Sequence, residues 1–152
     1  MAELDHVALL RMAIAESEKA KLAGVHPFAS ILVGPDGVVL MTQHNAFMPD
    51  HDMTGHAERV LMTRASTTLP MELLRECTIY TSAEPCAMCA GAIALARLKA
   101  LRFAAEDVKG GAVVNGPRLF GQLTCHHRPD VLGGIGEAEA GTLLREFFSA
   151  RR

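Results

Sequence analysis

The length, composition and charge of the chain are those of one globular domain. Its 152 residues are 49% apolar and 21% charged, which allows one sizeable core and excludes the disordered class. A formal charge of -2 excludes a broadly basic nucleic-acid surface, although Arg151-Arg152 can form a local basic patch. No apolar run approaches the roughly 20 residues of a membrane span, and the N-terminus is acidic, unlike an export signal. We expect one domain, residues 1–152, in the cytoplasm without a membrane partner.

The first half of the chain predicts a helix, a β-hairpin and a loop that leads into a second helix. Apolar residues at helical spacing predict a first helix with one side on a sheet, and Gly24 is suited to end it. Two β-prone runs flank a Pro-Asp-Gly turn, which predicts a hairpin. In chain order the segments are helix 4–23 with Val7, Leu10 and Ile14 as its apolar stripe, strands 28–34 and 38–42, the polar loop 45–55, and helix 56–66.

The second half predicts a strand, a helix and a strand in succession, followed by a last helix. This order is the βαβ unit, whose two strands run parallel. Together with the hairpin it predicts an α/β protein, a three-layer α-β-α sandwich around a mixed sheet. The segments are strand 78–81, helix 87–98, strand 100–104, the irregular glycine-rich stretch 109–136, and helix 137–150 with Leu143, Leu144, Phe147 and Phe148 as its apolar face.

Three residues have the chemistry and spacing of a catalytic zinc site. Cys86 and Cys89 lie at i and i+3 on a first helical turn, so both sulfurs project toward one ion, and His56 supplies a third ligand. Three protein ligands leave a fourth position for water or hydroxide, whereas a structural zinc has four. A structural site would need a fourth ligand, for which the candidates are Cys77, Cys125, His126 and His127. We expect one catalytic Zn²⁺ per chain.

The sequence also indicates roles for Glu58 and for the other cysteines, histidines and Met88 near these ligands or considered with them. Glu58, two residues after His56, is not on the same helix face, so we expect it beside the zinc-bound water as the proton shuttle. Cys77 is expected in the core, and Met88 is expected to pack there too because a thioether is a poor zinc ligand. Cys125, His126 and His127 leave open a second metal cluster or a substrate contact.

The His-Ala-Glu and Pro-Cys-x-x-Cys segments resemble the signature of the zinc-dependent cytidine and nucleobase deaminase superfamily. The likeness covers most of the chain and is closest to bacterial tRNA adenosine deaminases and guanine or cytosine deaminases. It rests on Asn45, on the segments 51–58 and 81–92, on Asp107-x-Lys109-x-Gly111-Ala112, and on 147–152. The resemblance implies a cytidine deaminase-like fold with a mixed five-stranded sheet, and a homodimer.

The resemblance also implies the residues that contact the substrate. By analogy with the family, the pocket is lined by Asn45, Ala57, Ser82, Ala83 and Glu84, with Phe28 as a wall. His26-Pro27-Phe28 is nearer to deaminases of free bases, and Ser82-Ala83 replaces a Thr-Leu pair common in the tRNA enzymes.

These features support a hydrolytic deaminase that converts an exocyclic amino group of a nucleobase or nucleoside (guanine-, cytosine- or adenine-type) to a carbonyl and releases ammonia. The near-neutral charge favours a small-molecule nucleobase or nucleoside as substrate. The alternative is a tRNA-specific adenosine deaminase that acts on a flipped-out wobble adenosine, which the tRNA-like segments support. A third hypothesis, of another class, is a non-catalytic zinc-stabilised binding module in which Glu58 has no role.

Overall fold

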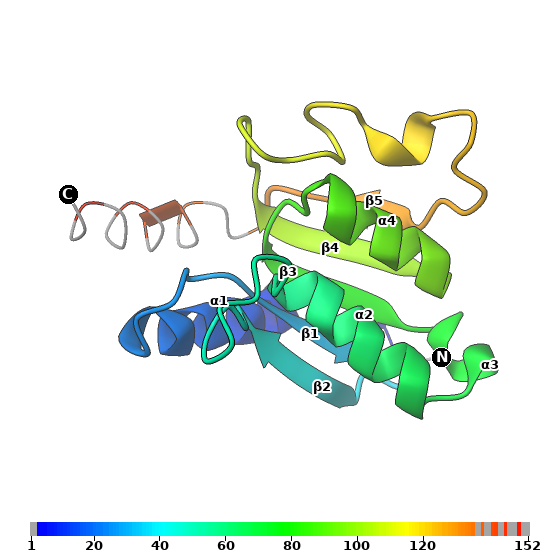
Figure 1. The fold of residues 1–152 in the computed structure, drawn as a ribbon. Helices are drawn as coiled ribbons and strands as arrows, with labels where there is room; N and C mark the ends of the chain where they lie inside the picture. Colours follow the sequence, from blue (N-terminus) through cyan, green and yellow to red (C-terminus); the bar gives the residue numbers. More distant parts are fainter. Residues whose placement is uncertain (1–2, 136–137, 139–140, 143–144, 146–148, 150–152) are drawn as a thin grey trace.

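A five-stranded mixed sheet forms the centre of the protein (Figure 1). The structure is a computed structural model that describes residues 3–135, 138, 141–142, 145 and 149. The strand order is β2-β1-β3-β4-β5. In chain order the elements are α1 His6–Leu22, β1 Ala29–Val33, β2 Val39–His44, α2 Ala57–Thr68, α3 Met71–Leu74, β3 Thr78–Ala83, α4 Ala87–Ala96, β4 Ala100–Ala105, the 3-10 helix η1 Leu119–Gly121, and β5 Asp130–Leu132.

Helices cover both faces of the sheet, which makes the three-layer sandwich that the sequence predicts. Figure 1 shows α2 and α4 in front of the sheet and α1 behind it. Because side chains alternate along a strand, β1 sends Leu32 into the core under α2 and α4, and Ile31 into the core under α1. β1, β3 and β4 are buried along their whole length. None of the described helices is both long and apolar enough to cross a membrane.

The local predictions agree with the structure in most elements. β1 and β2 pair antiparallel as the predicted hairpin, and β3 and β4 pair parallel around α4 as the predicted βαβ unit. Gly24 follows the end of α1 with φ +81°, the left-handed conformation that suits glycine. Cys77 is fully buried in the core, as predicted.

Three short elements and one helix face differ from the predictions. The sequence pattern did not reveal α3, and the stretch expected to be irregular contains η1 and β5. Of the predicted stripe, Leu10 is buried and Ile14 packs against the core, whereas Val7 is 48% exposed because the buried side of α1 continues through Ala13, Ser17 and Ala20. The predicted helix 137–150, with its four apolar residues, falls largely outside the described residues.

The sheet topology gathers several chain segments at one edge. β3 and β4 are parallel, so the segments that follow Ala83 and Ala105 leave the sheet at the same edge. β1 is antiparallel to both β2 and β3, so the residue before β1, Phe28, and the residue after β2, Asn45, lie at this edge too. Ligand sites in α/β proteins commonly form at the carboxyl ends of parallel strands. This edge is therefore where a site is expected.

Core packing under α2 generates a stability prediction. Leu61 is fully buried, whereas Leu22 is 83% exposed. Leu61→Ala is expected to lower the free energy of unfolding by about 2–5 kcal/mol, because a cavity replaces the side chain. The matched control Leu22→Ala should change it by less than about 0.5 kcal/mol. Urea unfolding at constant zinc measures both, and equal losses would contradict the assigned core.

Candidate metal centre and active site

A closed loop delivers His56 to the beginning of α2. The Ala46 N–H donates to the Gly55 carbonyl at 2.7 Å, and the His56 N–H donates to the Thr54 carbonyl at 2.8 Å. A Cβ on Gly55 would lie 2.6 Å from the Ala46 carbonyl oxygen, so this close backbone approach requires glycine. His56 itself is the N-cap residue of α2, with an extended backbone. Its position is therefore fixed by the loop on one side and the helix on the other.

The two cysteines lie on the first turn of α4. Cys86 is the N-cap residue and Cys89 is the third residue of the helix, which confirms that one turn carries both sulfurs. Pro85 directly precedes this cap residue. Its carbonyl accepts a hydrogen bond from the Ala112 N–H at 2.9 Å. Pro85 therefore connects the helix start to a distant loop.

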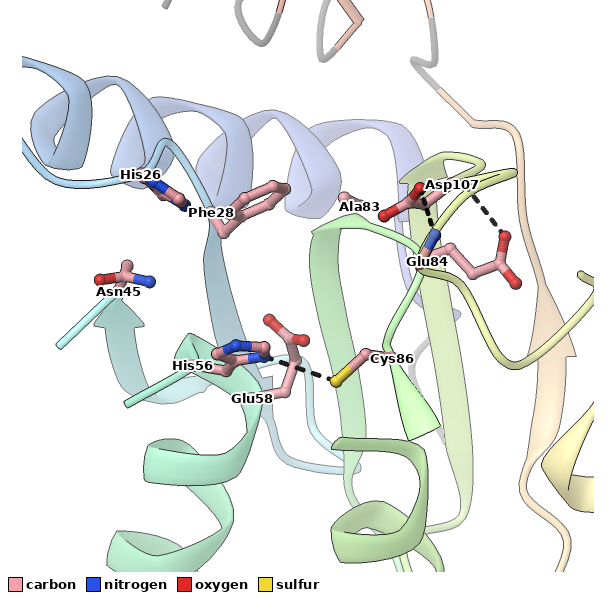
Figure 2. A pocket seen from close by; sticks show the side chains of 10 residues that line it. His26, Phe28, Asn45, His56, Glu58, Ala83, Glu84, Cys86 and Asp107 are labelled. Carbon is pink, nitrogen blue, oxygen red and sulfur yellow. Dashed lines mark hydrogen bonds between the residues drawn. The ribbon is translucent and has the colours of Figure 1, made fainter. Parts of the chain in front are cut away.

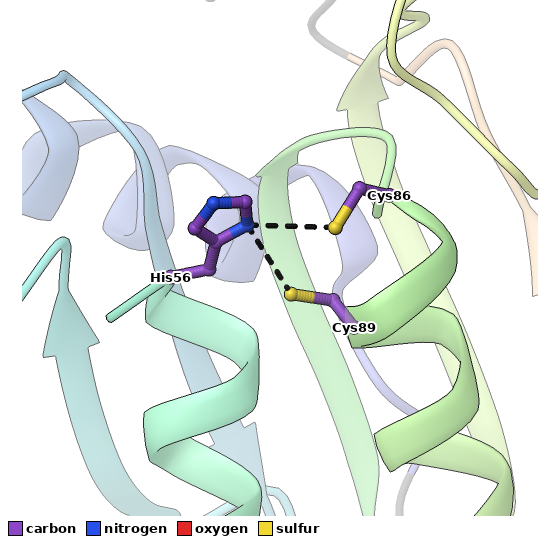
Figure 3. A group of neighbouring side chains, drawn as sticks. All are labelled: His56, Cys86 and Cys89. Atoms are coloured by element: carbon purple, nitrogen blue, oxygen red, sulfur yellow. Dashed lines mark hydrogen bonds between the residues drawn. The ribbon is translucent and has the colours of Figure 1, made fainter. Parts of the chain in front are cut away.

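The three side chains converge with the spacing of a tetrahedral zinc site (Figure 3). His56 Nδ1 lies 3.4 Å from Cys86 Sγ and 3.7 Å from Cys89 Sγ. Zn–N and Zn–S bonds at a tetrahedral angle separate nitrogen from sulfur by about 3.6 Å. All three ligand atoms lie within 4.8 Å of one another, and among the described residues no further His, Cys, Asp or Glu joins the group. The donor set therefore fits zinc, and none of the four candidate closing residues completes a structural site.

The two thiols influence each other's ionisation. A hydrogen bond with Cys89 lowers the pKa of Cys86 to about 5. The same hydrogen bond, together with burial, raises the pKa of Cys89. A divalent cation bound by both sulfurs deprotonates a coordinating thiol outright.

Glu58 is a buried carboxyl next to the metal ligands. It is the second residue of α2 and is only 7% exposed. Burial raises the pKa of Glu58 to about 7, because a charged carboxylate is poorly solvated there. Glu58 does not belong to the group of ligand atoms. A carboxyl that ionises near neutral pH can both take and give a proton.

A cavity of about 220 Å³ opens onto the metal ligands and Glu58 (Figure 2). Four of the residues that the resemblance placed in the pocket do line it, whereas Ala57 and Ser82 do not. Both are buried, and the alternation of side chains along β3 gives the cavity Ala83 instead of Ser82. The lining is His26, Phe28, Asn45, His56, Glu58, Ala83, Glu84, Cys86, Asp107 and Gly110.

Three lining residues were not among the predicted contacts: His26, Asp107 and Gly110. The sequence did contain a signal for two of them. The segment Asp107-x-Lys109-x-Gly111-Ala112 carries part of the family likeness, and Asp107 and Gly110 lie in it. Only the fold shows that this segment turns back over the site.

Asn45 and Ser82 have different local roles. Asn45 Oδ1 accepts a hydrogen bond from the Phe47 N–H at 2.9 Å, which orients the side chain. Figure 2 shows its amide nitrogen turned toward the other labelled side chains of the cavity. Ser82 Oγ accepts from the Ala29 N–H at 3.1 Å and joins β3 to the beginning of β1. Asn45 can therefore donate to a substrate, while Ser82 supports the wall from behind.

Cys125, His126 and His127, the candidates for a second metal cluster or a substrate contact, lie outside the cavity at the metal ligands. Cys125 Sγ contacts the His127 carbonyl at 3.1 Å, and His127 Nε2 lies 2.6 Å from the Leu98 carbonyl oxygen. Cys125, His126 and His127 line a separate cavity of about 300 Å³. The described part of the chain contains no second metal group. Met88 is 37% exposed, so the expectation that it packs into the core is wrong. The first turn of α4 faces the core with Cys89 instead.

Loss of one sulfur ligand should abolish metal binding. We expect Cys86→Ser to reduce the zinc content from one per chain to near zero, because a serine hydroxyl replaces the thiolate that the site provides. The matched control is Cys125→Ser, outside the group, which should keep its zinc. Mass-spectrometric metal analysis after dialysis against a chelator measures both variants. Zinc retained by Cys86→Ser would contradict this assignment.

Comparison with known proteins places this geometry in a family. Residues 4–105 match the cytidine and deoxycytidylate deaminase zinc-binding region. The chain is 40% identical over 152 residues to a tRNA-specific adenosine deaminase of Agrobacterium fabrum, covering 100% of this chain and 98% of the relative.

Two solved structures are also similar. One comes from work on A-to-I editing by tRNA:A34 deaminases at the wobble position of transfer RNA. It has a TM-score of 0.82 and 37% identity, and covers 90% of this chain and 99% of that chain. The other is guanine deaminase from Bacillus subtilis, with a TM-score of 0.60 and 34% identity over 67% of this chain and 65% of that one. This chain therefore belongs to the cytidine and deoxycytidylate deaminase zinc-binding family, and it is a deaminase, a hydrolase of C–N bonds in cyclic amidines.

Proposed function

We propose that this chain is a tRNA-specific adenosine deaminase that converts a wobble adenosine to inosine. The observation that carries the proposal is the extent of the similarity to the Agrobacterium fabrum enzyme, which covers 98% of that protein. The zinc-binding region ends at residue 105, so the similarity continues through the segments that follow β4. Substrate choice depends on pocket shape and on contacts around the flipped base. Two of the cavity residues, Asp107 and Gly110, lie in those later segments.

The shape of the site supports a base that is attached to a longer molecule. The cavity beside the metal ligands, about 220 Å³, is smaller than the roughly 300–1,000 Å³ of sites for larger ligands. A second cavity of about 440 Å³ adjoins it and shares His26, Asn45 and His56. One base fits the first cavity, and the second has room for a nucleotide next to that base. This arrangement favours a base that is part of a nucleic acid over a free base.

The chemistry follows from the residues around the first cavity. His56, Cys86 and Cys89 would hold one zinc ion per chain. The zinc, when bound, supplies an activated water.

Glu58 is placed to take a proton from the attacking water and to give it to the ring nitrogen beside the attacked carbon. Glu58 then moves the proton of the new hydroxyl group to the amino group, so that the C–N bond breaks, the C–O bond becomes a carbonyl and ammonia leaves. Asn45 would orient the nucleotide through its amide nitrogen.

We also propose that residues 1–152 form a single deaminase domain that acts in the cytoplasm.

Ammonia release from defined substrates tests the proposal. The native protein should release ammonia from an anticodon stem-loop with adenosine at the wobble position, and not from the same loop with guanosine there. Glu58→Gln should keep its zinc and lower kcat by about 10²–10⁴-fold, since the proton shuttle is lost. The control Glu72→Gln, exposed on α3, should remain fully active. Full activity of Glu58→Gln would contradict the role of Glu58 as proton shuttle, and no ammonia release from any substrate by the zinc-loaded native protein would support the non-catalytic binding module.

A second candidate is the deamination of a free purine such as guanine. Two observations favour it: the His26-Pro27-Phe28 segment, of which His26 and Phe28 line the cavity, and the similarity to the Bacillus subtilis guanine deaminase. The same assay separates the two candidates, because release from free guanine and not from the stem-loop would replace the proposal. RNA binding by the tRNA enzyme should also weaken steeply with salt, whereas turnover of a neutral base should not.

We further propose that the protein is a homodimer that uses the outer side of α4. Met88 and Leu95 on this helix are 37% and 86% exposed. The nearby cavity of about 300 Å³ is also lined by Gly91, Ala94 and Leu119. An exposed apolar patch of this kind indicates a protein contact.

A charge on this face should prevent dimer formation. Leu95→Asp is expected to sediment as a monomer, because the carboxylate would be buried in the contact without a partner. The control Leu22→Asp, 83% exposed at the end of α1, should sediment like the native protein. Sedimentation velocity over a concentration series measures this difference, and a dimeric Leu95→Asp would disprove the proposed face.

A further inference from the structure

Glu84 is a buried acid that the proposed chemistry does not use. It is 4% exposed and lies directly between β3 and the Pro85-Cys86 step. Figure 2 shows its carboxylate turned away from His56 and Glu58, toward the segment that follows β4. We propose that Glu84 is a positioning residue, whose carboxylate orders residues 106–115, the positioning loop, and so sets the cavity wall that the substrate base meets.

The carboxylate accepts five hydrogen bonds from the positioning loop. Oε2 accepts from three consecutive backbone N–H groups, those of Val113, Val114 and Asn115, at 3.0, 2.9 and 3.1 Å. Oε1 accepts from the Asp107 N–H at 3.1 Å and from Asn115 Nδ2 at 2.7 Å. Successive N–H groups that converge in this way form an anion-binding nest. Here the anion is the chain's own carboxylate, so the loop is folded around Glu84.

Close packing gives the loop little freedom around this carboxylate. A Cβ on Gly111 would lie 2.5 Å from the Glu84 carboxyl carbon and 2.5 Å from the Asp107 carbonyl oxygen. The next residue, Ala112, donates its N–H to the Pro85 carbonyl at 2.9 Å. The Glu84 N–H donates to the Ala105 carbonyl at 2.7 Å. Glu84 thus connects the cysteine turn to both ends of the loop.

The positioning loop also forms part of the cavity wall that faces the substrate. Asp107 and Gly110 line the cavity together with Glu58 and Cys86. Asp107 Oδ1 accepts from the N–H groups of Lys109 and Gly110, at 3.1 and 2.8 Å, so the wall is a tight turn held by its own side chain. Without the carboxylate, four backbone N–H groups would lose their acceptor, and the turn could shift. A shift of about 1 Å at a substrate contact can cost about 10²-fold in rate.

A purely structural role is the alternative, and it predicts different behaviour. A structural residue would change stability and zinc content together, and leave the folded, zinc-loaded protein with normal kinetics. A positioning residue changes the kinetics while the zinc stays bound, because the hydrogen bonds of the Glu84 carboxylate go to the positioning loop and not to the three metal ligands. The inference rests on the proposed function only for the choice of substrate in the kinetic assay.

The experiment compares Glu84→Gln and Glu84→Ala with the native protein and with Glu76→Gln. Glu76 is half exposed just before β3, at the other end of the strand, where it pairs with Lys99 at 3.7 Å, so it matches the chemistry without touching the loop. The readouts are zinc per chain, amide hydrogen exchange of residues 113–115, and kcat and KM on the stem-loop.

We expect one zinc per chain in every variant and at least about tenfold faster exchange at residues 113–115 in Glu84→Ala, whose amides have lost their acceptor. In Glu84→Ala the value of kcat/KM should fall by about 10²-fold relative to the native protein. Glu84→Gln should lie between, because its one remaining carbonyl oxygen can still accept from the three consecutive N–H groups. Glu76→Gln should match the native protein in all three readouts.

Two results would overturn the inference: unchanged exchange at residues 113–115, or normal kcat and KM in zinc-loaded Glu84→Ala. If Glu84→Ala does not fold, Glu84→Gln decides by the same criteria. An inactive native protein would instead refute the proposed function, and the exchange and zinc data would still show whether Glu84 orders the loop.

Discussion

The meeting of one imidazole nitrogen and two sulfurs at one edge of the sheet is the constraint on which the rest of the structure depends. Each ligand lies at the first turn of a helix: His56 caps α2, and Cys86 and Cys89 begin α4. The positive ends of helices favour thiolate charge there, and a divalent cation bound to the folded chain adds its binding energy to folding. The sheet keeps the starts of α2 and α4 close together, because both helices pack on the same face.

The site divides into a rigid part and a variable part. The candidate metal ligands and Glu58 lie at the starts of helices that are packed on the sheet, which holds these side chains in a fixed arrangement. Most of the substrate wall comes from segments between elements: the residues before β1, the loop after β2 and the positioning loop after β4. Loops tolerate change better than the elements that they connect. Family members can therefore share one chemistry and differ in substrate.

Buried polar groups show how the two parts are joined. Ser82 accepts from the backbone of Ala29, and Pro85 accepts from Ala112. Glu84 accepts from four backbone N–H groups at once. Buried polar groups of this kind must be satisfied, and satisfying them holds irregular chain against a regular frame. The end of β3 and the residues after it thus connect the cysteines at the start of α4 to the loops that form the substrate wall.

Local patterns in the sequence predicted the hairpin, the βαβ unit and the buried Cys77, because each depends on neighbours a few residues apart. His56 lies 30 residues before Cys86, so its assignment as a ligand came from its chemistry and its motif and not from local spacing. Cys86 and Cys89 share a helical turn wherever that helix lies. The tertiary structure alone decided that β5 pairs with β4 and that Ala83 instead of Ser82 faces the cavity. It also decided that residues 113–115 fold around Glu84. These features depend on hydrogen bonds and packing between residues about thirty positions apart, which no local periodicity encodes.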